Sequence, residues 1–184
     1  MKKKIIITGG LGYIGTELCK LYSGVSWYHE ILVIDNRFIS ERVNQLRNWN
    51  MNFLQGDILD KEMVNKNFKD ADVVHHLAGI TNVPRTQSES VKSHDEKILS
   101  VAKDGTKNIL DAMNDNCKII FPSTHVVYEG IGEVSKDIKE EEETKPVLSY
   151  SKSKAINEKQ IKESKKNYVI LRLGSVYGYS TDTM

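Results

Sequence analysis

Cysteine, proline and long apolar runs are scarce in this sequence. The chain has 184 residues, with two cysteines and three prolines. Cys19 and Cys117 stand far apart, with neither zinc-ligand spacing nor the pattern of a disulfide framework, which predicts a reduced, cytoplasmic setting. No apolar stretch approaches the length of a membrane span. The apolar run behind the N-terminal lysines is too short for a signal peptide.

Net charge is also nearly absent. The formal charge is +1, and no long basic stripe occurs, which disfavours nucleic acid as a partner. The acidic run at residues 140–143 is most simply a solvated loop. We therefore expect a soluble cytoplasmic protein with neither a nucleic-acid nor a membrane partner.

Strand-like and helix-like segments alternate along the chain. Apolar runs predict strands over 4–8, 31–34, 51–54, 72–77, 118–121 and 168–173, the fifth ended by Pro122. Helical periodicity predicts helices over 12–23, 40–48, 60–68, 88–114 and 149–164, with Ser40 and Asp60 at the starts of two of them. This order predicts an α/β fold, a doubly wound parallel (Rossmann) sheet with helices on both faces. Residues 129–147 form the one long irregular stretch.

A glycine-rich loop joins the first strand to the first helix. Gly10, Gly12 and Gly15 satisfy G-x-G-x-x-G, and Gly9, Gly12 and Gly15 satisfy its wider variant. Such glycines permit a sharp turn, close approach of a pyrophosphate and tight packing of the helix on the strand. The free N–H groups of the helix N-terminus then face the anion.

Asp35 closes the second strand, 20 positions after Gly15. A carboxylate there accepts hydrogen bonds from the adenosine ribose and repels a 2′-phosphate, which favours NAD over NADP. Arg37 weakens that preference, because a nearby arginine could hold a 2′-phosphate. Together with the glycines, Asp35 predicts a dinucleotide site.

Tyr150 and Lys154 are four residues apart at the start of a predicted helix, and so share one face. A nearby cation lowers the pKa of a tyrosine, which makes Tyr150 a plausible general base. Upstream, Ser123 and Thr124 follow a strand at the sheet edge where ligands bind, and either hydroxyl could orient a substrate oxygen.

Taken together, these motifs resemble the extended short-chain dehydrogenase/reductase family, the NAD-dependent epimerases and dehydratases of nucleotide sugars. The resemblance covers almost the whole chain. Its landmarks are Thr8–Gly15, Asp35–Asn36, Gly56–Ile58, His75–Gly79, Gly105–Leu110, Ser123–Tyr128, Tyr150–Lys154 and Arg172–Gly178.

The resemblance implies a role for each matched residue. Tyr150 is the implied catalytic base, Lys154 holds the nicotinamide ribose and lowers the Tyr150 pKa, and Thr124 is the hydroxyl partner. The implied contacts to NAD are Gly9, Gly12, Tyr13, Ile14, Gly15, Asp35, Asn36, Asp57, Ile58, Leu77, Ala78, Gly79, Tyr150 and Lys154. The candidate contacts to a nucleotide-sugar substrate are Ser123, Thr124, His125 and Ser175. His75 and His76 have no third ligand in view, so no metal site is expected.

The sequence departs from the family at the elimination residues. The 4,6-dehydratases of the family carry an Asp-Glu pair directly after the catalytic threonine, where this chain has His125 and Val126. This favours an epimerase over a 4,6-dehydratase, and also disfavours a related decarboxylase that uses an acid there. Two alternatives stay open: a non-catalytic NAD-binding module or fragment, and an NAD(P)H-dependent keto-sugar reductase.

Length is the largest departure. The resemblance implies a second, smaller domain that grips the nucleotide sugar, and we expect it to be largely absent from this chain. The expected division is an NAD-binding domain at residues 1–173 and the start of a truncated substrate-binding region at 174–184. The resemblance also implies a homodimer through the helices at 88–114 and 149–164.

Overall fold

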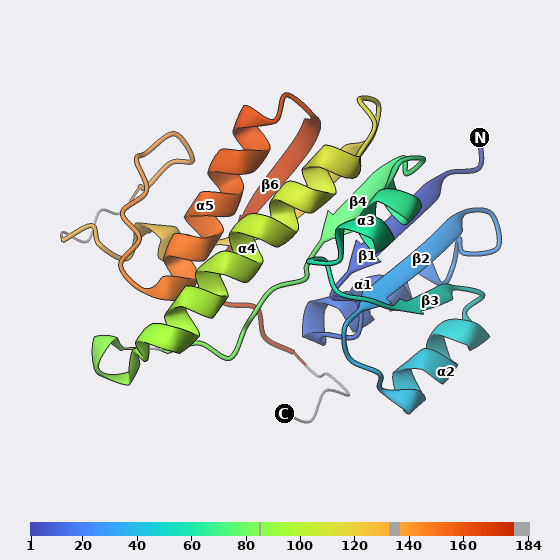
Figure 1. The fold of residues 1–184 in the computed structure, drawn as a ribbon, viewed down its shortest axis with the longest axis horizontal. Helices are drawn as coiled ribbons and strands as arrows, with labels where there is room; N and C mark the ends of the chain where they lie inside the picture. Colours follow the sequence, from blue (N-terminus) through green and yellow to red (C-terminus); the bar gives the residue numbers. More distant parts are fainter. Residues whose placement is uncertain (85, 133–136, 179–184) are drawn as a thin grey trace.

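Six parallel strands form one sheet in the order β3-β2-β1-β4-β5-β6 (Figure 1). The computed structural model describes residues 1–84, 86–132 and 137–178. The strands are β1 (Lys4–Thr8), β2 (Glu30–Asp35), β3 (Asn52–Gln55), β4 (Val73–His76), β5 (Lys118–Thr124) and β6 (Asn167–Leu173). The order of strands reverses between β1 and β4, where ligands of such sheets bind beyond the carboxyl ends of the strands.

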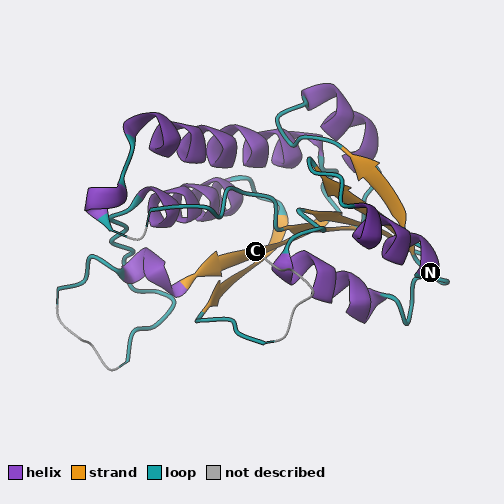
Figure 2. Cartoon of the chain, turned by 90° about the horizontal axis from the view of Figure 1, so that it is seen from below, coloured by secondary structure: helices purple, strands orange, loops and turns teal. Residues whose placement is uncertain are grey.

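Helices connect the strands and cover the sheet. They are α1 (Tyr13–Tyr22), α2 (Ser40–Asn48), α3 (Lys61–Phe68), α4 (Lys92–Ala112) and α5 (Ser149–Glu163), with short 3-10 turns η1 (Gln87–Glu89) and η2 (His125–Tyr128). Side chains of α3, α4 and α5 join the apolar cluster on one face, whereas α1 and α2 pack into the cluster on the other (Figure 2). The predicted doubly wound α/β sheet is confirmed.

The central strand shows why the sequence folds this way. Ile6 and Ile7 point to opposite faces of β1 and are both fully buried, one in each apolar cluster. A strand covered by helices on both faces needs such a continuous β-branched run. At β6 the cover differs: Val169 and Leu171 are 38% and 44% exposed, since no helix of the described residues covers that face (Figure 2). Helices therefore cover both faces only around the first four strands.

Three local expectations need correction. β5 continues through Pro122 to Thr124 instead of ending at the proline. Pro122 pairs only with Leu171 of β6, because β5 has by then run past the end of β4, so no ladder hydrogen bond is lost on that side. Ser40 is the first helical residue, and its predicted N-cap position belongs to Ile39.

The third correction concerns α4, which begins at Lys92 and not at residue 88, because η1 and an extended Ser90 precede it. By contrast, Asp60 is confirmed as the N-cap of α3. Its carboxylate accepts from Glu62 N and Met63 N at 3.0 Å each.

The two cysteines are buried free thiols. Burial raises the pKa of Cys19 to about 12 and that of Cys117 to about 11, so neither forms a thiolate at neutral pH. Among the described residues, no helix is both long and apolar enough to cross a bilayer. Residues 179–184, the end of the predicted substrate-binding region, lie outside the described residues.

Candidate active site

The glycine-rich loop between β1 and α1 lies against the segment after β4. Gly9 has a φ of +66°, and a Cβ there would lie 2.7 Å from Ala78 N. A Cβ on Gly15 would lie 2.4 Å from Gly9 O, so neither position has room for a side chain. On Gly12, by contrast, the nearest atom to a Cβ would be Gly9 O at 3.2 Å. The loop therefore packs closely at Gly9 and Gly15 and somewhat less tightly at Gly12, as expected for a glycine turn whose backbone approaches a pyrophosphate.

The N-terminus of α1 faces the glycine-rich loop, and no side chain balances its partial positive charge. Gly12 is the N-cap, so no side chain caps the helix, and no acidic residue stands in its first turn. The N–H groups of that turn and the helix dipole therefore favour an anion. Tyr13 begins the helix, and its hydroxyl donates to Gly178 O at 2.8 Å, while Ile14 is exposed beside it. These features fit the diphosphate of a dinucleotide.

Asp35 lies at the end of β2, with only 5% of its surface exposed. Its Oδ2 accepts from Leu11 N at 3.0 Å, and its Oδ1 accepts from Arg37 N at 3.0 Å and Arg37 Nε at 3.2 Å. Asp35 thus holds the glycine-rich loop in place from the neighbouring strand. Asn36 follows as an exposed residue, with its carbonyl accepting from the Gln55 side chain.

The segments after β3 and β4 complete the predicted cofactor edge. Asp57 is exposed and accepts from Leu59 N at 2.9 Å, but the Ile58 side chain is buried against α4, where a Cβ on Gly105 would lie 2.3 Å from it. Ile58 can therefore meet a ligand only through its backbone. After β4, Leu77 N and Ala78 N donate to the carbonyl and hydroxyl of Thr8, and Gly79 is exposed.

A buried polar network crosses the fold behind this edge. Its centre is His76, which is fully buried, with Nδ1 3.0 Å from Thr8 Oγ1 and Nε2 2.9 Å from Thr106 Oγ1. Asn157 of α5 donates to the same Thr106 hydroxyl at 2.7 Å. Burial, and secondarily the charge of Lys154, lowers the pKa of His76 to about 3, so the ring is neutral. The network joins β1, β4, α4 and α5, and sequence reasoning missed it.

The neighbouring His75 points to the opposite face of the sheet. Its Nε2 lies 2.8 Å from the Tyr22 hydroxyl, and burial lowers its pKa to about 4. The two histidines cannot share a metal ion, because successive strand residues face opposite ways. In the described ranges, no group of three or more His, Cys, Asp or Glu side chains could hold a metal ion.

Tyr150 and Lys154 share the face of α5 that meets β5. Lys154 Nζ donates to Pro122 O at 3.0 Å, and lies 4.6 Å from the Phe121 ring centroid and 5.8 Å from that of Tyr150. Burial lowers the pKa of Lys154 to about 8 and raises that of Tyr150. The upward shift of the Tyr150 pKa is opposite to the sequence expectation, because desolvation disfavours the charged phenolate.

The two hydroxyls at the end of β5, those of Ser123 and Thr124, have different roles. Thr124 Oγ1 accepts from Val126 N at 3.3 Å as the N-cap of η2, which leaves its proton free to be donated. Ser123 points the other way and donates to Glu158 at 2.6 Å, so its expected use as a substrate contact is not supported. His125 is exposed, with Nδ1 donating to Leu173 O at 3.2 Å, and Ser175 is exposed beyond β6.

A buried ion pair lies beside the site. Arg172 donates through Nε and Nη2 to the two carboxylate oxygens of Glu158, at 3.0 and 2.6 Å. Burial by itself would raise the pKa of Glu158, but the bonds from Arg172 and Ser123 hold it below its usual value. Glu158 is four residues beyond Lys154 on one helix face, a signal that could have indicated it from the sequence.

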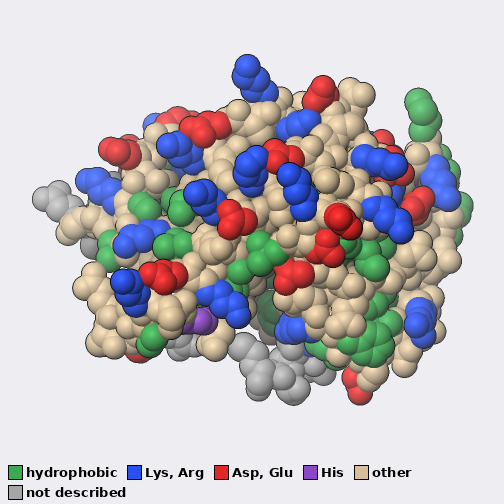
Figure 3. Space-filling model, in the orientation of Figure 1, with side chains coloured by type: hydrophobic (Ala, Val, Ile, Leu, Met, Phe, Trp, Pro, Cys, Tyr) green, Lys and Arg blue, Asp and Glu red, His purple; other side chains and the backbone are tan. Residues whose placement is uncertain are grey.

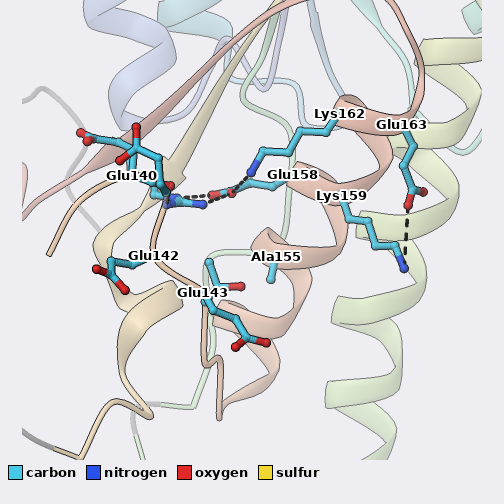
Figure 4. A pocket seen from close by; sticks show the side chains of 11 residues that line it. Glu140, Glu142, Glu143, Ala155, Glu158, Lys159, Lys162 and Glu163 are labelled. Carbon is cyan, nitrogen blue, oxygen red and sulfur yellow. Dashed lines mark hydrogen bonds and ion pairs between the residues drawn. The ribbon is translucent and has the colours of Figure 1, made fainter.

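This ion pair also forms the wall of a pocket of about 450 Å³ between α5 and residues 140–144 (Figure 4). Glutamates of residues 140–143 line its outer side and are exposed, as expected for a solvated loop. None of the predicted site residues lines the pocket, so it is separate from the candidate active site.

Replacing Arg172 by leucine is expected to lower the free energy of unfolding by about 3 kcal/mol, because the buried Glu158 carboxylate loses its bidentate partner and keeps only the half-exposed Lys162 at 3.5 Å. Urea unfolding followed by circular dichroism measures the change. Glu163→Gln is the matched control, since the Lys159–Glu163 pair on the same helix is exposed and worth less than about 1 kcal/mol (Figure 4). Equal effects of the two substitutions would contradict the prediction.

Glu129 connects the strand end that carries Thr124 to the helix that carries Tyr150. Its carboxylate accepts from Val147 N and Leu148 N at 2.7 Å each, and also from the Ser151 hydroxyl. Helix α5 has no side-chain cap of its own, and Glu129 satisfies from outside the helix the N–H of its N-cap, Leu148. It thereby fixes the start of the helix, and sequence reasoning missed it because the contact crosses the irregular 129–147 segment.

Comparison with known proteins identifies relatives. The model of the NAD dependent epimerase/dehydratase family matches residues 5–184. A putative UDP-glucose 4-epimerase of Methanocaldococcus jannaschii is 34% identical over 97% of this chain and 57% of its own length. A dTDP-D-glucose 4,6-dehydratase of Dictyostelium discoideum is 30% identical over 96% of this chain and 44% of its own length.

Solved structures agree in fold. The structure of UDP-glucose 4-epimerase from Brucella ovis in complex with NAD matches 92% of this chain and 51% of its own, with a TM-score of 0.75 and 27% identity. The chain thus spans about half the length of the proteins it matches. The relatives include both an epimerase and a dehydratase, so similarity alone does not separate the two reactions.

Proposed function

Because the chain belongs to the NAD dependent epimerase/dehydratase family, we propose that it binds NAD at the glycine-rich loop and epimerises a nucleotide sugar. When bound, NAD would supply a reversible hydride acceptor at the sugar carbinol carbon. The remaining chemistry belongs to the chain's own residues. They must hold the cofactor, orient the hydroxyl and move its proton.

Residues from three loops would hold the cofactor. The glycine-rich loop at Gly12 and the uncapped start of α1, with Tyr13 and Ile14, fit the diphosphate. Asp35 and Asn36 would receive the adenosine ribose, and the exposed Asp57 with the Ile58 backbone would lie by the adenine. Leu77, Ala78 and Gly79 would line the other side of the crevice, against which Gly9 already packs.

The observation that carries the catalytic part of the proposal is the hydrogen bond from Lys154 to Pro122 O at 3.0 Å. It brings the helix with Tyr150 against the strand end with Thr124. Thr124 has a proton to donate to a sugar oxygen, and Tyr150 would accept the proton of the carbinol. Lys154 is the cation beside the phenol, with its ammonium 5.8 Å from the Tyr150 ring centroid.

Epimerase is preferred over 4,6-dehydratase because of the two residues directly after Thr124. An elimination needs an acid and a base there, but the chain supplies His125 and Val126. Two alternatives remain. A non-catalytic NAD-binding module would bind the cofactor without turnover, and a keto-sugar reductase would consume reduced cofactor as a co-substrate.

Incubation of the purified chain with NAD and UDP-glucose, UDP-N-acetylglucosamine or dTDP-glucose tests the proposal. The expected result is an epimer at the carbinol carbon, detected by proton NMR, with no net change in NADH absorbance. In a second incubation with NADH and a keto-sugar as substrate, a fall in NADH absorbance would instead identify the reductase. NADH binding without turnover would favour the binding module, and no NADH binding would overturn the proposal.

Pairing of two copies through α4 and α5 is a further part of the proposal. Apolar side chains of α4, including Ile98 and Ile109, are buried in the chain itself. The outward face of these helices carries interspersed acidic and basic groups (Figure 3), so polar contacts would have to join the dimer. Light scattering that gives the mass of one chain would exclude it.

A further inference from the structure

Thr124 and Tyr150 reach the candidate active site from two elements that a long loop separates in the chain. Thr124 is the N-cap of η2, and Tyr150 is the second residue of α5. The irregular segment at residues 129–147 runs between these elements. A loop of that length does not by itself fix the distance between its two ends. The relative placement of the two hydroxyls therefore depends on contacts that bridge the loop.

Backbone hydrogen bonds close the neck of this loop. Lys145 N donates to Val127 O, and Gly130 N donates to Lys145 O, at 2.8 Å each. The two chain segments approach closely there, since a Cβ on Gly130 would lie 2.5 Å from Lys145 O. These bonds join η2 to residue 145, which precedes the first residue of α5, Ser149. They bring the helix near η2 but do not reach its first turn.

Glu129 makes a bridge that does reach the first turn. It is the C-cap of η2, the short turn that Thr124 begins. Its Oε1 accepts from Val147 N and Leu148 N at 2.7 Å each, and also from the hydroxyl of Ser151. Leu148 and Ser151 stand on either side of the proposed base in the chain. One carboxylate oxygen thus ties the turn that Thr124 begins to the helical turn that carries the base.

Contacts with the strands hold the body of α5 further along the helix. Lys154 Nζ donates to Pro122 O at 3.0 Å, and the Glu158 carboxylate accepts from Ser123 and Arg172. A helix frays at its ends before its body opens, so the first turn needs support of its own. A carboxylate at a helix N-terminus gives such support and also interacts favourably with the helix dipole.

We propose that Glu129 is a positioning residue, whose carboxylate sets the first turn of α5 so that Tyr150 and Thr124 meet the same sugar oxygen. The inference rests on the proposed function and adds to it a residue that acts through Tyr150. Glu129 contributes reach and acceptor geometry more than charge, because two of its three partners are backbone N–H groups. A misplacement of about 1 Å between reacting groups can cost about 10²-fold in rate, so turnover should depend on this bridge.

Steady-state kinetics of Glu129 variants with a nucleotide sugar test the proposal. Glu129→Ala should lower kcat by about 10–100-fold, while KM and the NADH dissociation constant change by less than about threefold. Glu129→Gln keeps an acceptor oxygen at the same reach, so its kcat should return to within about fivefold of the native value. Glu129→Asp keeps the charge but is one methylene shorter, so it should resemble Glu129→Ala.

Glu141→Ala is the matched control, because Glu141 is an exposed glutamate of the same loop. It should leave kcat, KM and NADH binding unchanged. A Glu129→Gln variant as slow as Glu129→Ala would overturn the proposal, since acceptor geometry would then not suffice. Parallel losses of kcat and NADH affinity in Glu129→Ala would overturn it too, because the substitution would then disturb the whole fold. An unchanged kcat in Glu129→Ala would show that the bridge has no part in positioning.

Amide hydrogen exchange separates failure of this inference from failure of the proposed function. By NMR, the amides of Val147 and Leu148 should exchange at least about tenfold faster in Glu129→Ala than in the native chain or in Glu129→Gln. Equal exchange in all three would overturn the bridge, whether or not the chain turns over a sugar. Absence of turnover in the native chain would refute the proposed function and the catalytic use of the bridge, even where the exchange data support the bridge itself.

Discussion

In the variant Tyr150→Phe, turnover of a nucleotide sugar is expected to fall by about 10²–10⁴-fold, the usual worth of a positioned general base. Phenylalanine keeps the ring against Lys154 but has no oxygen to accept the carbinol proton. Burial raises the pKa of Tyr150, so the phenol needs positive charge nearby to work at neutral pH. In the described structure that charge is Lys154, bonded to Pro122 O.

Two measurements together check this expectation. Conversion of the nucleotide sugar is followed by NMR, and NADH binding by fluorescence, which should stay within about tenfold because at most one neutral hydrogen bond is lost. Tyr168→Phe, on the half-exposed outer strand β6, is the matched control. A Tyr150→Phe variant as active as the native chain would place the base elsewhere. Absence of turnover in both forms would favour the binding module.

Acidification below pH 6.5 is expected to destabilise the fold strongly, because two buried histidines resist protonation. His75 and His76 are buried neutral, with folded-state pKa values lowered from 6.5 to about 4 and about 3. Below pH 6.5 the unfolded chain binds two protons that the folded chain does not. The free energy of unfolding therefore decreases as the pH is lowered. Between pH 6.5 and about 4.5 the loss is roughly 5 kcal/mol, a large part of a typical domain's total.

Urea unfolding at a series of pH values measures this slope. We expect His76→Asn to be less stable than the native chain at neutral pH, because Thr8 and Thr106 lose a shared partner. Its stability should nevertheless fall about half as steeply on acidification, since one of the two titrating groups is gone. His125→Gln, which removes an exposed histidine, should leave the slope unchanged. If the stability of the native chain fell with decreasing pH no more steeply than that of His76→Asn, His76 would not be one of the two groups responsible.

The positions of helices and strands depend on local sequence, whereas some of their ends depend on neighbouring elements. Element positions were predicted to within a few residues because they follow local periodicity, as in the β-branched run of β1 or the N-cap Asp60. The error at Pro122 arose because a neighbouring strand decided the outcome. Pro122 continues β5 only because β4 has already ended beside it, and no local signal carries that information.

The candidate site divides in the same way. The sequence by itself determined the glycine spacing, the carboxylate after the second strand and the Tyr150–Lys154 face, because each depends on residues close together in the chain. Only the tertiary structure decided which groups those side chains meet. Ser123 bonds to Glu158, His76 joins Thr8 to Thr106, and the pKa of Tyr150 moves upward. Burial and long-range partners set such properties, and both arise only when distant segments pack together.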